Sequence, residues 1–385
     1  MGFCIRLPLI GQIAWPLYAC LFLTAIASAA DVTVFVGTYT NGQSKSKGIY
    51  SLQFDETSGQ LSAPTLAVES ESPSFLAMHP SGRYLYAANE HPSGPPNAPG
   101  TVSAFSVDGA TLKLINIVSS RGAGPCHVAV DRTGHWLFAA NYMGGSIAAF
   151  PIQANGALGE ASSFFQHTLT SVEPRQKEPH AHMVVLSPDN RFLLVADLGG
   201  DRVFVYRFDE RSGKLTLNDP PGGILPPGSG PRHIAFSRDG KLLYVLSELK
   251  DTVTTFRWDA GKGALESTDS LSALPFGYSG PKSGAEIAVH PAGKFLYTSN
   301  RGHDSIAMFA IAADGKLTAS GHEPTRGKTP RNFAIDPAGK FLLAANQDSS
   351  TIAVFRIDEH TGKLAPLGEP VTVPTPVSIL FPPRR

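Results

Sequence analysis

A motif of about fifteen residues recurs six times along this chain of 385 residues, and this recurrence constrains the fold more than any other feature. Each copy has a short apolar run, a turn containing Gly, Pro, Asp or Ser, and a second apolar run that ends in a polar residue. The second runs end 52, 56, 50, 53 and 46 residues apart, at Asn89, Asn141, Asp197, Ser247, Asn300 and Asn346. A fixed period of about 50 residues is typical of the blades of a β-propeller.

The copy around residue 240 indicates the order of strands within one blade. A first apolar strand at 234–236 leads through a turn at 237–240 into a second strand at 242–247. The third strand, 252–258, alternates in side-chain character with a period of two, and a weaker fourth strand begins near residue 264. No segment after residue 30 keeps a helical period for three turns, so the sequence excludes a helical solenoid and an α/β fold.

The two ends of the repeat region supply the parts of one further blade. Residues 34–38 and 48–54 resemble a second and a third strand, whereas 376–380 resembles a first strand with nothing after it. Pairing between these ends would close the ring and remove its exposed edges. The sequence therefore predicts an all-β fold: a seven-bladed β-propeller, formed by residues 31–385 and closed by pairing of the C-terminal strand with the N-terminal blade.

The first 30 residues have a different character. Arg6 is their one charged side chain, an apolar stretch follows it, and residues 27–29, Ala-Ser-Ala, fit an A-x-A cleavage signal. We interpret residues 1–30 as a secretory signal peptide, which predicts export to the periplasm or the extracellular space. The alternative is an uncleaved membrane anchor over residues 7–29. Cleavage would leave no stable membrane insertion.

Composition narrows the range of partners. Lys+Arg and Asp+Glu are equal at 32 each, so there is no basic surplus to bind nucleic acid. No P-loop, dinucleotide fingerprint or G-x-S-x-G motif occurs. Removal of residues 1–30 would leave Cys126 as the one cysteine, which excludes an intrachain disulfide. We expect a monomer that binds a small molecule.

One mouth of the propeller channel carries the candidate site. The first and second strands of a blade are antiparallel, so the start of one lies beside the end of the other. The positions just after the second strands are Tyr39, Glu90, Tyr142, Leu198, Glu248, Arg301 and Gln347. The first strands start at Phe75, His127, His182, His233, Glu286, Asn332 and Ser378, with Arg232 and Arg331 directly before two of them. These repeat positions diversify into polar and ionisable types, which indicates a functional mouth.

Several short motifs at these positions resemble a known family. They are Phe35-Val-Gly-Thr-Tyr39, Asn141-Tyr-Met-Gly-Gly-Ser146, Pro179-His-Ala-His182, Gly230-Pro-Arg-His233, Ser247-Glu248 and Ser299-Asn-Arg-Gly302. Together they resemble the seven-bladed propeller lactonases, over about residues 32–381. That family includes one type of bacterial 6-phosphogluconolactonase and the fungal carboxy-cis,cis-muconate lactonising enzyme.

The resemblance implies an active site made of a histidine, two arginines and a glutamate, acting without a metal or another cofactor. By motif the catalytic residues would be His182 (or His180), Arg232, Glu248 and Arg301. The neighbouring candidates for substrate binding are His180, Asn141, Tyr142, His233 and Arg331. Lactone hydrolysis needs a base for the attacking water and positive charge for the carbonyl oxyanion. Glu248 and His182 are both candidates for the base, and the arginines suit a carboxylate, a phosphate or the oxyanion.

Structural interpretations of the same residues stay open. Arg232 and Arg331 occupy the same repeat position, so a Pro-Arg pair also fits the blade pattern. Glu248 and Arg301 also fit a structural ion pair. Asn141 and its counterparts in other blades also suit hydrogen bonding to the backbone at strand ends.

One metal interpretation is also open. His127, His182 and His233 come from successive blades and would suit a divalent ion, although no short ligand spacing such as H-x-x-x-H supports it.

The predicted activity is hydrolysis of a sugar-type lactone, similar to that of a 6-phosphogluconolactonase. Export fits poorly with a phosphorylated cytoplasmic metabolite, so an unphosphorylated lactone is a further candidate substrate. The alternatives are a carboxymuconate lactonising reaction, which would use the same arginines for carboxylates, and a non-catalytic exported binding propeller.

Overall fold

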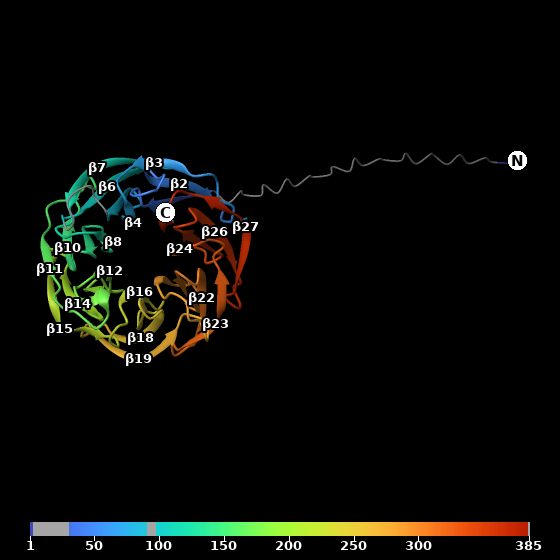
Figure 1. Ribbon diagram of the computed structural model, residues 1–385. Coiled ribbons are helices and arrows are strands. Elements are labelled where there is room, and N and C mark those ends of the chain that lie inside the picture. The colour runs from blue at the N-terminus through green and yellow to red at the C-terminus, as the bar shows by residue number, and fades with distance from the viewer. Residues whose placement is uncertain (3–30, 91–97, 384–385) are drawn as a thin grey trace.

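The computed structural model describes residues 1–2, 31–90 and 98–383 of the chain. Its strands form seven four-stranded antiparallel sheets that stand around a common axis as the blades of a ring (Figure 1). The predicted seven-bladed propeller is therefore confirmed. Within these described ranges the one helical element is the 3-10 turn η1, Pro174–Gln176.

The innermost and second strands of each blade follow the repeat. The innermost strands are β4 (Pro73–Met78), β8 (Pro125–Val130), β12 (Ala181–Leu186), β16 (Pro231–Phe236), β20 (Gly284–Val289), β24 (Pro330–Ile335) and β28 (Pro376–Leu380). The second strands are β1 (Val32–Thr38), β5 (Tyr84–Asn89), β9 (Trp136–Asn141), β13 (Phe192–Asp197), β17 (Leu242–Ser247), β21 (Phe295–Asn300) and β25 (Phe341–Asn346). All six second strands of the repeat end at the polar residue that the sequence predicts.

The third and outermost strands complete each blade. The third strands are β2 (Gly48–Phe54), β6 (Thr101–Asp108), β10 (Ser146–Pro151), β14 (Arg202–Asp209), β18 (Thr252–Asp259), β22 (Ser305–Ile311) and β26 (Thr351–Ile357). The outermost strands are β3 (Thr65–Glu69), β7 (Thr111–Ser119), β11 (Ser163–Gln166), β15 (Lys214–Ile224), β19 (Ala264–Ser272), β23 (Leu317–Pro324) and β27 (Leu364–Thr372). Blade 1 contains β28, β1, β2 and β3, and blades 2 to 7 each contain four consecutive strands, β4–β7 through β24–β27.

Blade 1 joins the two ends of the chain, as the sequence predicts. β28 pairs antiparallel with β1, with Phe35 opposite Leu380 and Gly37 opposite Ser378. A side chain at position 37 would lie 2.4 Å from the Pro73 carbonyl oxygen, so glycine lets blade 2 pack closely against this pair. The innermost strands contact one another in sequence around the axis, and β28 contacts both β24 and β4. The ring is thus continuous.

The hydrophobic core lies between neighbouring blades. Every residue of β9, β13, β21 and β25 is buried, because these second strands have a blade on both faces. Between blades 7 and 1, the Phe341 ring meets Phe54 edge-on with ring centres 5.5 Å apart. The same ring fills the space over Gly59, whose φ of +79° also favours glycine. Apolar packing therefore holds each blade to the next.

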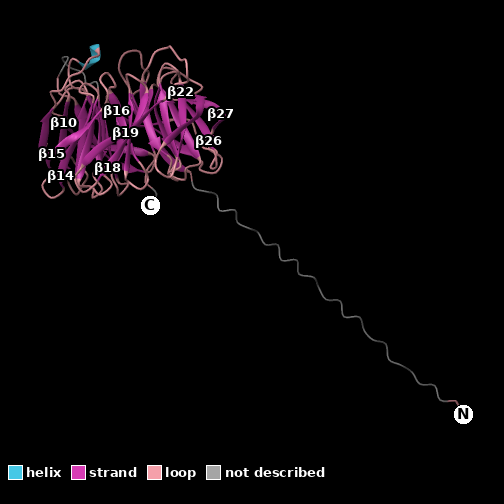
Figure 2. Cartoon of the chain, turned by 90° about the horizontal axis from the view of Figure 1, so that it is seen from below, coloured by secondary structure: helices cyan, strands magenta, loops and turns pink. Residues whose placement is uncertain are grey.

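The predicted mouth is confirmed as a shared edge of the blades. In blade 5, Pro231 at the start of β16 lies opposite Ser247 at the end of β17, and in blade 3 Pro125 lies opposite Asn141. η1 lies among the loops of one face and the C-terminus on the other face (Figure 2). Side chains that start the innermost strands therefore converge at one end of the channel.

The predicted signal peptide lies almost wholly outside the described residues, since residues 3–30 are not among them. Over the ranges that are described, no helix has the length and apolar character needed to cross a membrane. The interpretation of residues 1–30 stays a prediction.

Replacement of Phe341 by Ala is expected to lower the free energy of unfolding by about 3–5 kcal/mol, because it empties the packed space between blades 7 and 1. Chemical denaturation followed by tryptophan fluorescence measures this. Phe276→Ala is the matched control, since that ring is fully exposed and its loss should change stability by less than about 0.5 kcal/mol. Equal losses in the two variants would contradict the packing described above.

Candidate active site

Glu248 lies at the centre of a cluster of guanidinium groups at the mouth. It follows β17 directly and its side chain is buried. Arg232 Nε and Arg301 Nη2 each lie 3.0 Å from Glu248 Oε2, and Arg175 Nη1 lies 2.7 Å from Oε1. Of these three contacts, the one with Arg175 has hydrogen-bond geometry. The other two are ion pairs whose angles do not suit a hydrogen bond.

The backbone of blade 6 fixes the two deeper arginines. Arg232 Nη1 donates to the Ala285 carbonyl oxygen at 2.6 Å. Arg301 donates from Nε to the Ser283 oxygen at 3.3 Å and from Nη2 to the Gly284 oxygen at 3.2 Å. Both guanidinium groups are therefore held by carbonyl groups at the start of β20, independently of Glu248.

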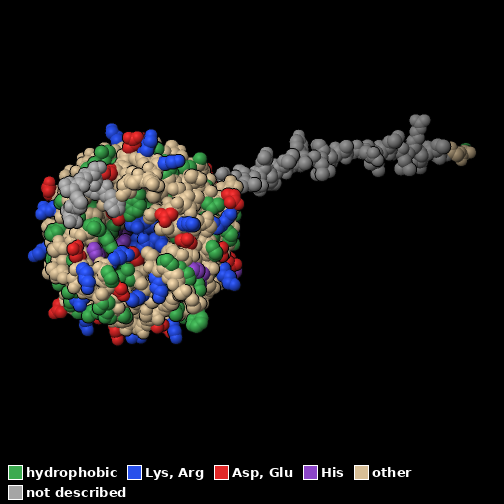
Figure 3. All heavy atoms as spheres, in the orientation of Figure 1, with side chains coloured by type: hydrophobic (Ala, Val, Ile, Leu, Met, Phe, Trp, Pro, Cys, Tyr) green, Lys and Arg blue, Asp and Glu red, His purple; other side chains and the backbone are tan. Residues whose placement is uncertain are grey.

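The cluster keeps its charges at neutral pH. Burial alone would raise the pKa of the Glu248 carboxyl, but the three guanidinium groups outweigh it and lower this pKa to about 2. Burial and the nearby Arg301 lower the pKa of Arg232 to about 10. Lys and Arg side chains gather at the centre of this face (Figure 3). The mouth thus presents three positive charges around one carboxylate.

Sequence reasoning missed Arg175. This residue lies in η1, within the connection from β11 to β12, and it has no counterpart at the repeat positions compared above. The one sequence signal for this loop is the length of its repeat. The spacing from Asn141 to Asp197 is 56 residues, the longest between the ends of successive second strands. The extra residues form a loop that reaches over the mouth.

Tyr142 and His180 form the wall beside this loop. Their rings stack with centres 4.4 Å apart, and His180 Nδ1 lies 2.9 Å from the Tyr142 carbonyl oxygen. The Tyr142 hydroxyl accepts a hydrogen bond of 2.6 Å from Arg175 Nη2. His182 meets the Tyr142 ring edge-on at 5.5 Å. The structure therefore brings His180, Tyr142 and His182 together next to the guanidinium cluster.

His182 is a buried, neutral imidazole. Burial and the nearby Arg232 lower its pKa well below the usual value for histidine. Its Nδ1 is buried and has no hydrogen-bond partner among the described residues. His182 and Arg232 line the same small cavity in the channel. The site thus has a free imidazole nitrogen close to fixed positive charge.

The three channel histidines do not form a metal site in the part of the chain that the structure describes, where no group of three or more His, Cys, Asp or Glu side chains has a suitable geometry. The ring of His233 lies 5.2 Å from that of His182 and 5.5 Å from that of His127. His233 Nδ1 instead lies 2.8 Å from Glu286 Oε1. The metal interpretation of these histidines therefore finds no support among the described residues.

Arg331 belongs to a second ion pair in the same channel. Its Nη2 lies 3.5 Å from Glu90 Oε1, and its guanidinium carbon lies 5.1 Å from the centre of the Tyr39 ring. The Glu90 carboxylate also accepts a hydrogen bond of 2.7 Å from the Tyr39 hydroxyl. Arg331 lines the small channel cavity together with Arg232, so the structure places it next to the predicted catalytic group.

Asn141 has a clear structural contact. Its Nδ2 donates to the Ser120 carbonyl oxygen and to Ser146 Oγ, both at 3.1 Å. Asn300 and Asn346 donate to carbonyl groups in the same way in their own blades. The strand-end role is therefore present, and a role of Asn141 in substrate binding stays a prediction.

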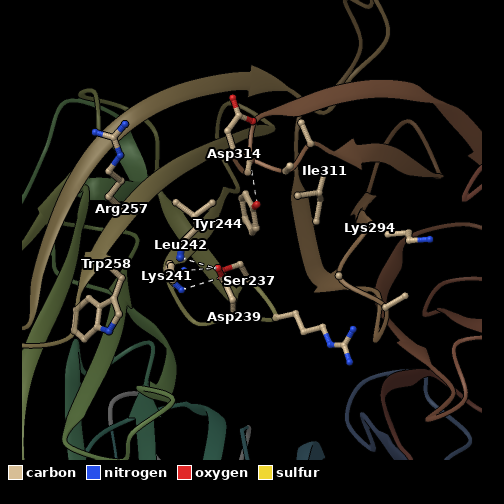
Figure 4. A pocket seen from close by; sticks show the side chains of 16 residues that line it. Ser237, Asp239, Lys241, Leu242, Tyr244, Arg257, Trp258, Lys294, Ile311 and Asp314 are labelled. Carbon is tan, nitrogen blue, oxygen red and sulfur yellow. Dashed lines mark hydrogen bonds and ion pairs between the residues drawn. The ribbon is translucent and has the colours of Figure 1, made fainter.

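A larger cavity, of about 910 Å3, lies on the opposite face between blades 5 and 6 (Figure 4). The cavity opens beside Leu242, the first residue of β17, where the side chain is smaller than in most other blades. The residues at the corresponding position in five other blades are aromatic: Tyr84, Trp136, Phe192, Phe295 and Phe341. Its charged side chains are exposed surface groups such as Lys241 and Asp239, which lie 3.6 Å apart. Without a buried charge or a free imidazole, this cavity is the weaker candidate for chemistry.

Comparison with known proteins agrees with this architecture. The family model described as "Lactonase, 7-bladed beta-propeller" matches residues 33–381. The chain belongs to this family. The resemblance predicted over about residues 32–381 is therefore confirmed.

Three proteins that are similar to this chain align with nearly the whole propeller. A protein of Bacillus subtilis named 6-phosphogluconolactonase is 34% identical over 350 residues, covering 90% of this chain and 97% of its own length. The solved structure of a periplasmic gluconolactonase of Pseudomonas aeruginosa is 33% identical, with a TM-score of 0.86, covering 92% of this chain and 99% of that one. A putative 6-phosphogluconolactonase of Bacteroides fragilis is 36% identical, with a TM-score of 0.84 and the same coverage.

A buried carboxyl beneath the site makes the stability of this propeller depend on pH. Asp251 is buried in the connection after β17, and burial raises its pKa to about 7. The unfolded chain has a pKa near 4 at this group, so the folded state binds the proton more tightly. The contribution of Asp251 to the free energy of unfolding is therefore expected to fall as the pH rises from about 4 through 7.

Asp251→Asn is expected to remove this dependence and to stabilise the protein by up to about 4 kcal/mol at pH 8, with no gain at pH 4. The φ of +49° at this position suits asparagine. Urea denaturation of both proteins at the two pH values measures the effect. Asp239→Asn, at an exposed turn, should give no gain at pH 8. A gain that is the same at both pH values would refute the titration of Asp251.

Proposed function

We propose that this protein hydrolyses a sugar-type lactone without a metal ion, at the mouth that holds Glu248. The observation that supports this most is the joint position of a neutral imidazole, His182, and three guanidinium groups around one buried carboxylate. Membership of the lactonase family and the names of its relatives agree with this reaction type.

Arg232 and Arg301 supply the positive charge in this proposal. A lactone carbonyl gains negative charge on its oxygen when water attacks it, and fixed cations in a buried site stabilise that oxyanion strongly. The carbonyl groups at the start of β20 hold both side chains, so little reorganisation is needed as the charge develops. These two guanidinium groups would provide the electrostatic stabilisation that the reaction needs.

His182 is the base in this proposal, and Glu248 orders the arginines. A carboxylate with a pKa of about 2 accepts a proton poorly at neutral pH. The His182 imidazole is unprotonated and has a free nitrogen. These two observations support the histidine over the glutamate, the two candidates that the sequence left open.

The steps follow from these positions. His182 takes a proton from water as the water oxygen bonds to the lactone carbonyl carbon, whose oxygen becomes negative beside the arginines. The tetrahedral intermediate then expels the ring oxygen, which takes the proton back from His182. The product is the open hydroxy acid, whose new carboxyl group loses its proton to solvent, and the resulting carboxylate stays paired with the arginines until release.

The first 30 residues support a proposal about the compartment of the reaction. We propose that residues 1–30 are a cleaved signal peptide and that the propeller is exported. The A-x-A sequence at 27–29 and the periplasmic location named for the Pseudomonas aeruginosa relative support this. N-terminal sequencing of the exported protein should start at residue 30 or 31, and a full-length chain held in the membrane would refute it.

Loss of either the proposed base or a proposed oxyanion-stabilising arginine should strongly reduce turnover while the fold stays intact. We expect His182→Gln and Arg232→Met each to lower kcat/KM by at least 100-fold on a hydrolysed lactone, because they remove the base and the oxyanion charge. A pH-indicator assay with glucono-1,5-lactone and 6-phosphoglucono-1,5-lactone, with and without EDTA, measures this.

Matched controls separate the site from general effects. Arg257→Met and His360→Gln change the same residue types at exposed positions and should keep wild-type turnover. Turnover retained in both site variants would reject the site. Binding of lactones without turnover in the wild type would favour the binding propeller, and turnover of a carboxymuconate would favour the lactonising reaction. Loss of activity in EDTA, restored by a divalent metal, would reject the metal-free reaction.

The pH profile tests the assignment of the base. If the base were a histidine with an ordinary pKa, kcat/KM would fall to half of its maximum near pH 6.5. Because burial and Arg232 depress the pKa of His182, kcat/KM on a neutral lactone should stay level from pH 7 to below pH 6.5 and fall at lower pH. Initial rates corrected for spontaneous hydrolysis give the profile. A fall centred above pH 6.5 would contradict His182 as the base.

A further inference from the structure

Arg175 differs from the other two arginines that contact Glu248. The side chain of Arg175 is 49% exposed, whereas those of Arg232 and Arg301 are 3% and 14% exposed. Arg175 contacts Oε1 of Glu248, whereas Arg232 and Arg301 both contact Oε2. Arg175 is therefore the outermost charge of the cluster, on the side that faces solvent.

The loop around Arg175 is anchored on both sides of that residue. Gln176 is fully buried, and its Nε2 donates at 2.8 Å to the Leu198 carbonyl oxygen and to Asp201 Oδ1. On the other side, Glu173 pairs with Lys250 at 3.1 Å. The backbone at residue 175 is thus fixed by contacts that do not involve the arginine side chain.

The guanidinium group of Arg175 has unused hydrogen-bonding capacity. Of its five N–H groups, one donates to Glu248 and one to the Tyr142 hydroxyl. The remaining three make no hydrogen bond with the part of the chain that the structure describes. Because the Arg175 side chain is half exposed and donates to the Tyr142 hydroxyl, these N–H groups lie at the rim of the mouth. An anion that enters the mouth would meet them before it reaches the deeper arginines.

The arrangement of the charges points the same way. Three guanidinium groups surround the Glu248 carboxylate, and the buried, ionised carboxylate of Glu286 also acts on Arg232, which leaves one positive charge in excess at neutral pH. Hydrolysis of a neutral lactone develops one negative charge, on the carbonyl oxygen. The deeper Arg232 and Arg301 face this charge in the proposed reaction, so the exposed Arg175 is the arginine left to meet an anionic group that the substrate itself carries.

We propose that Arg175 is a specificity-determining residue that binds a second anionic group of the substrate, a carboxylate or a phosphate, outside the ester that is cleaved. The proposal rests on the function proposed above. It narrows the substrate class to acidic sugar lactones. A planar guanidinium group with free N–H groups suits both anions, because it can bind two oxygens at once.

The test compares three lactones: neutral glucono-1,5-lactone, 6-phosphoglucono-1,5-lactone with a phosphate, and glucaro-1,4-lactone with a carboxylate. Arg175→Met should lower kcat/KM on the preferred acidic lactone by about 10- to 100-fold, mainly through KM, and change it on the neutral lactone by less than about 3-fold. The acidic lactone that loses more identifies the anion. Arg175→Lys should recover part of the loss, because it restores the charge without the planar fork.

Two variants separate binding from support of the loop. Glu173→Gln loosens the anchor without touching the guanidinium group and should leave the preference among the three lactones unchanged. Arg257→Met, on the opposite face, is the control for loss of an arginine. Equal losses on neutral and acidic lactones in Arg175→Met would overturn the proposal, since the residue would then act by positioning Glu248. Unchanged kinetics on all three would also overturn it.

Failure of the proposed function would look different. If the wild-type protein hydrolyses none of these lactones, calorimetry with 6-phosphogluconate, glucarate and gluconate still tests Arg175. Arg175→Met should then weaken the binding of 6-phosphogluconate or glucarate by about 10-fold or more and that of gluconate by much less. Equal weakening for all three acids would reject the specificity role independently of catalysis.

Discussion

Closure of the ring is the constraint on which the rest of the structure depends. An open row of blades would leave β1 with an unpaired inner edge and would leave one apolar face of blades 1 and 7 in water. β28 supplies the missing strand to blade 1, and Phe341 packs against Phe54 across the junction. Once the ring is closed, the antiparallel register brings the starts of the innermost strands and the ends of the second strands to one mouth. Residues from blades 4, 5 and 6 can then surround a single point.

The charge cluster at that point is poorly explained by stability. Removing Glu248 and Arg232 from water costs several kcal/mol per ion, and a buried ion pair often gains no more than it loses. Apolar side chains would fill the same space at no such cost, as they do between the blades. The cluster also holds more positive than negative charge, which is unfavourable until an anion is present. Buried charge of this kind is typical of a binding or catalytic site.

The sequence predicts the fold and several residues of the candidate site for one reason: both follow the repeat. The repeat puts Arg232, Glu248 and Arg301 at the same mouth, and in the structure each of the two arginines lies 3.0 Å from Glu248. Arg175 lies in the connection from β11 to β12 and not at a repeat position, so a comparison of repeat positions could not find it. The base, proposed here as His182, could not be chosen from the sequence for a different reason, because the choice depends on the pKa of each group, which packing and neighbouring charges decide. The amide contacts of Asn141 likewise need coordinates.

Binding of an anion and the strength of the base are linked in this arrangement. The arginines near His182 contribute to its low pKa, after burial itself. A ligand carboxylate or phosphate placed about 6 Å from the imidazole would offset them by about 3 kcal/mol at an effective dielectric constant near 20, or about 2 pKa units. The empty site therefore keeps the imidazole unprotonated, and the filled site makes the same imidazole a better proton acceptor. An acidic substrate would in this way strengthen the base that takes a proton from the attacking water. With a neutral lactone, the pKa of His182 would stay depressed. In the proposed reaction, the excess positive charge of the mouth would thus favour acidic substrates both in binding and in proton transfer.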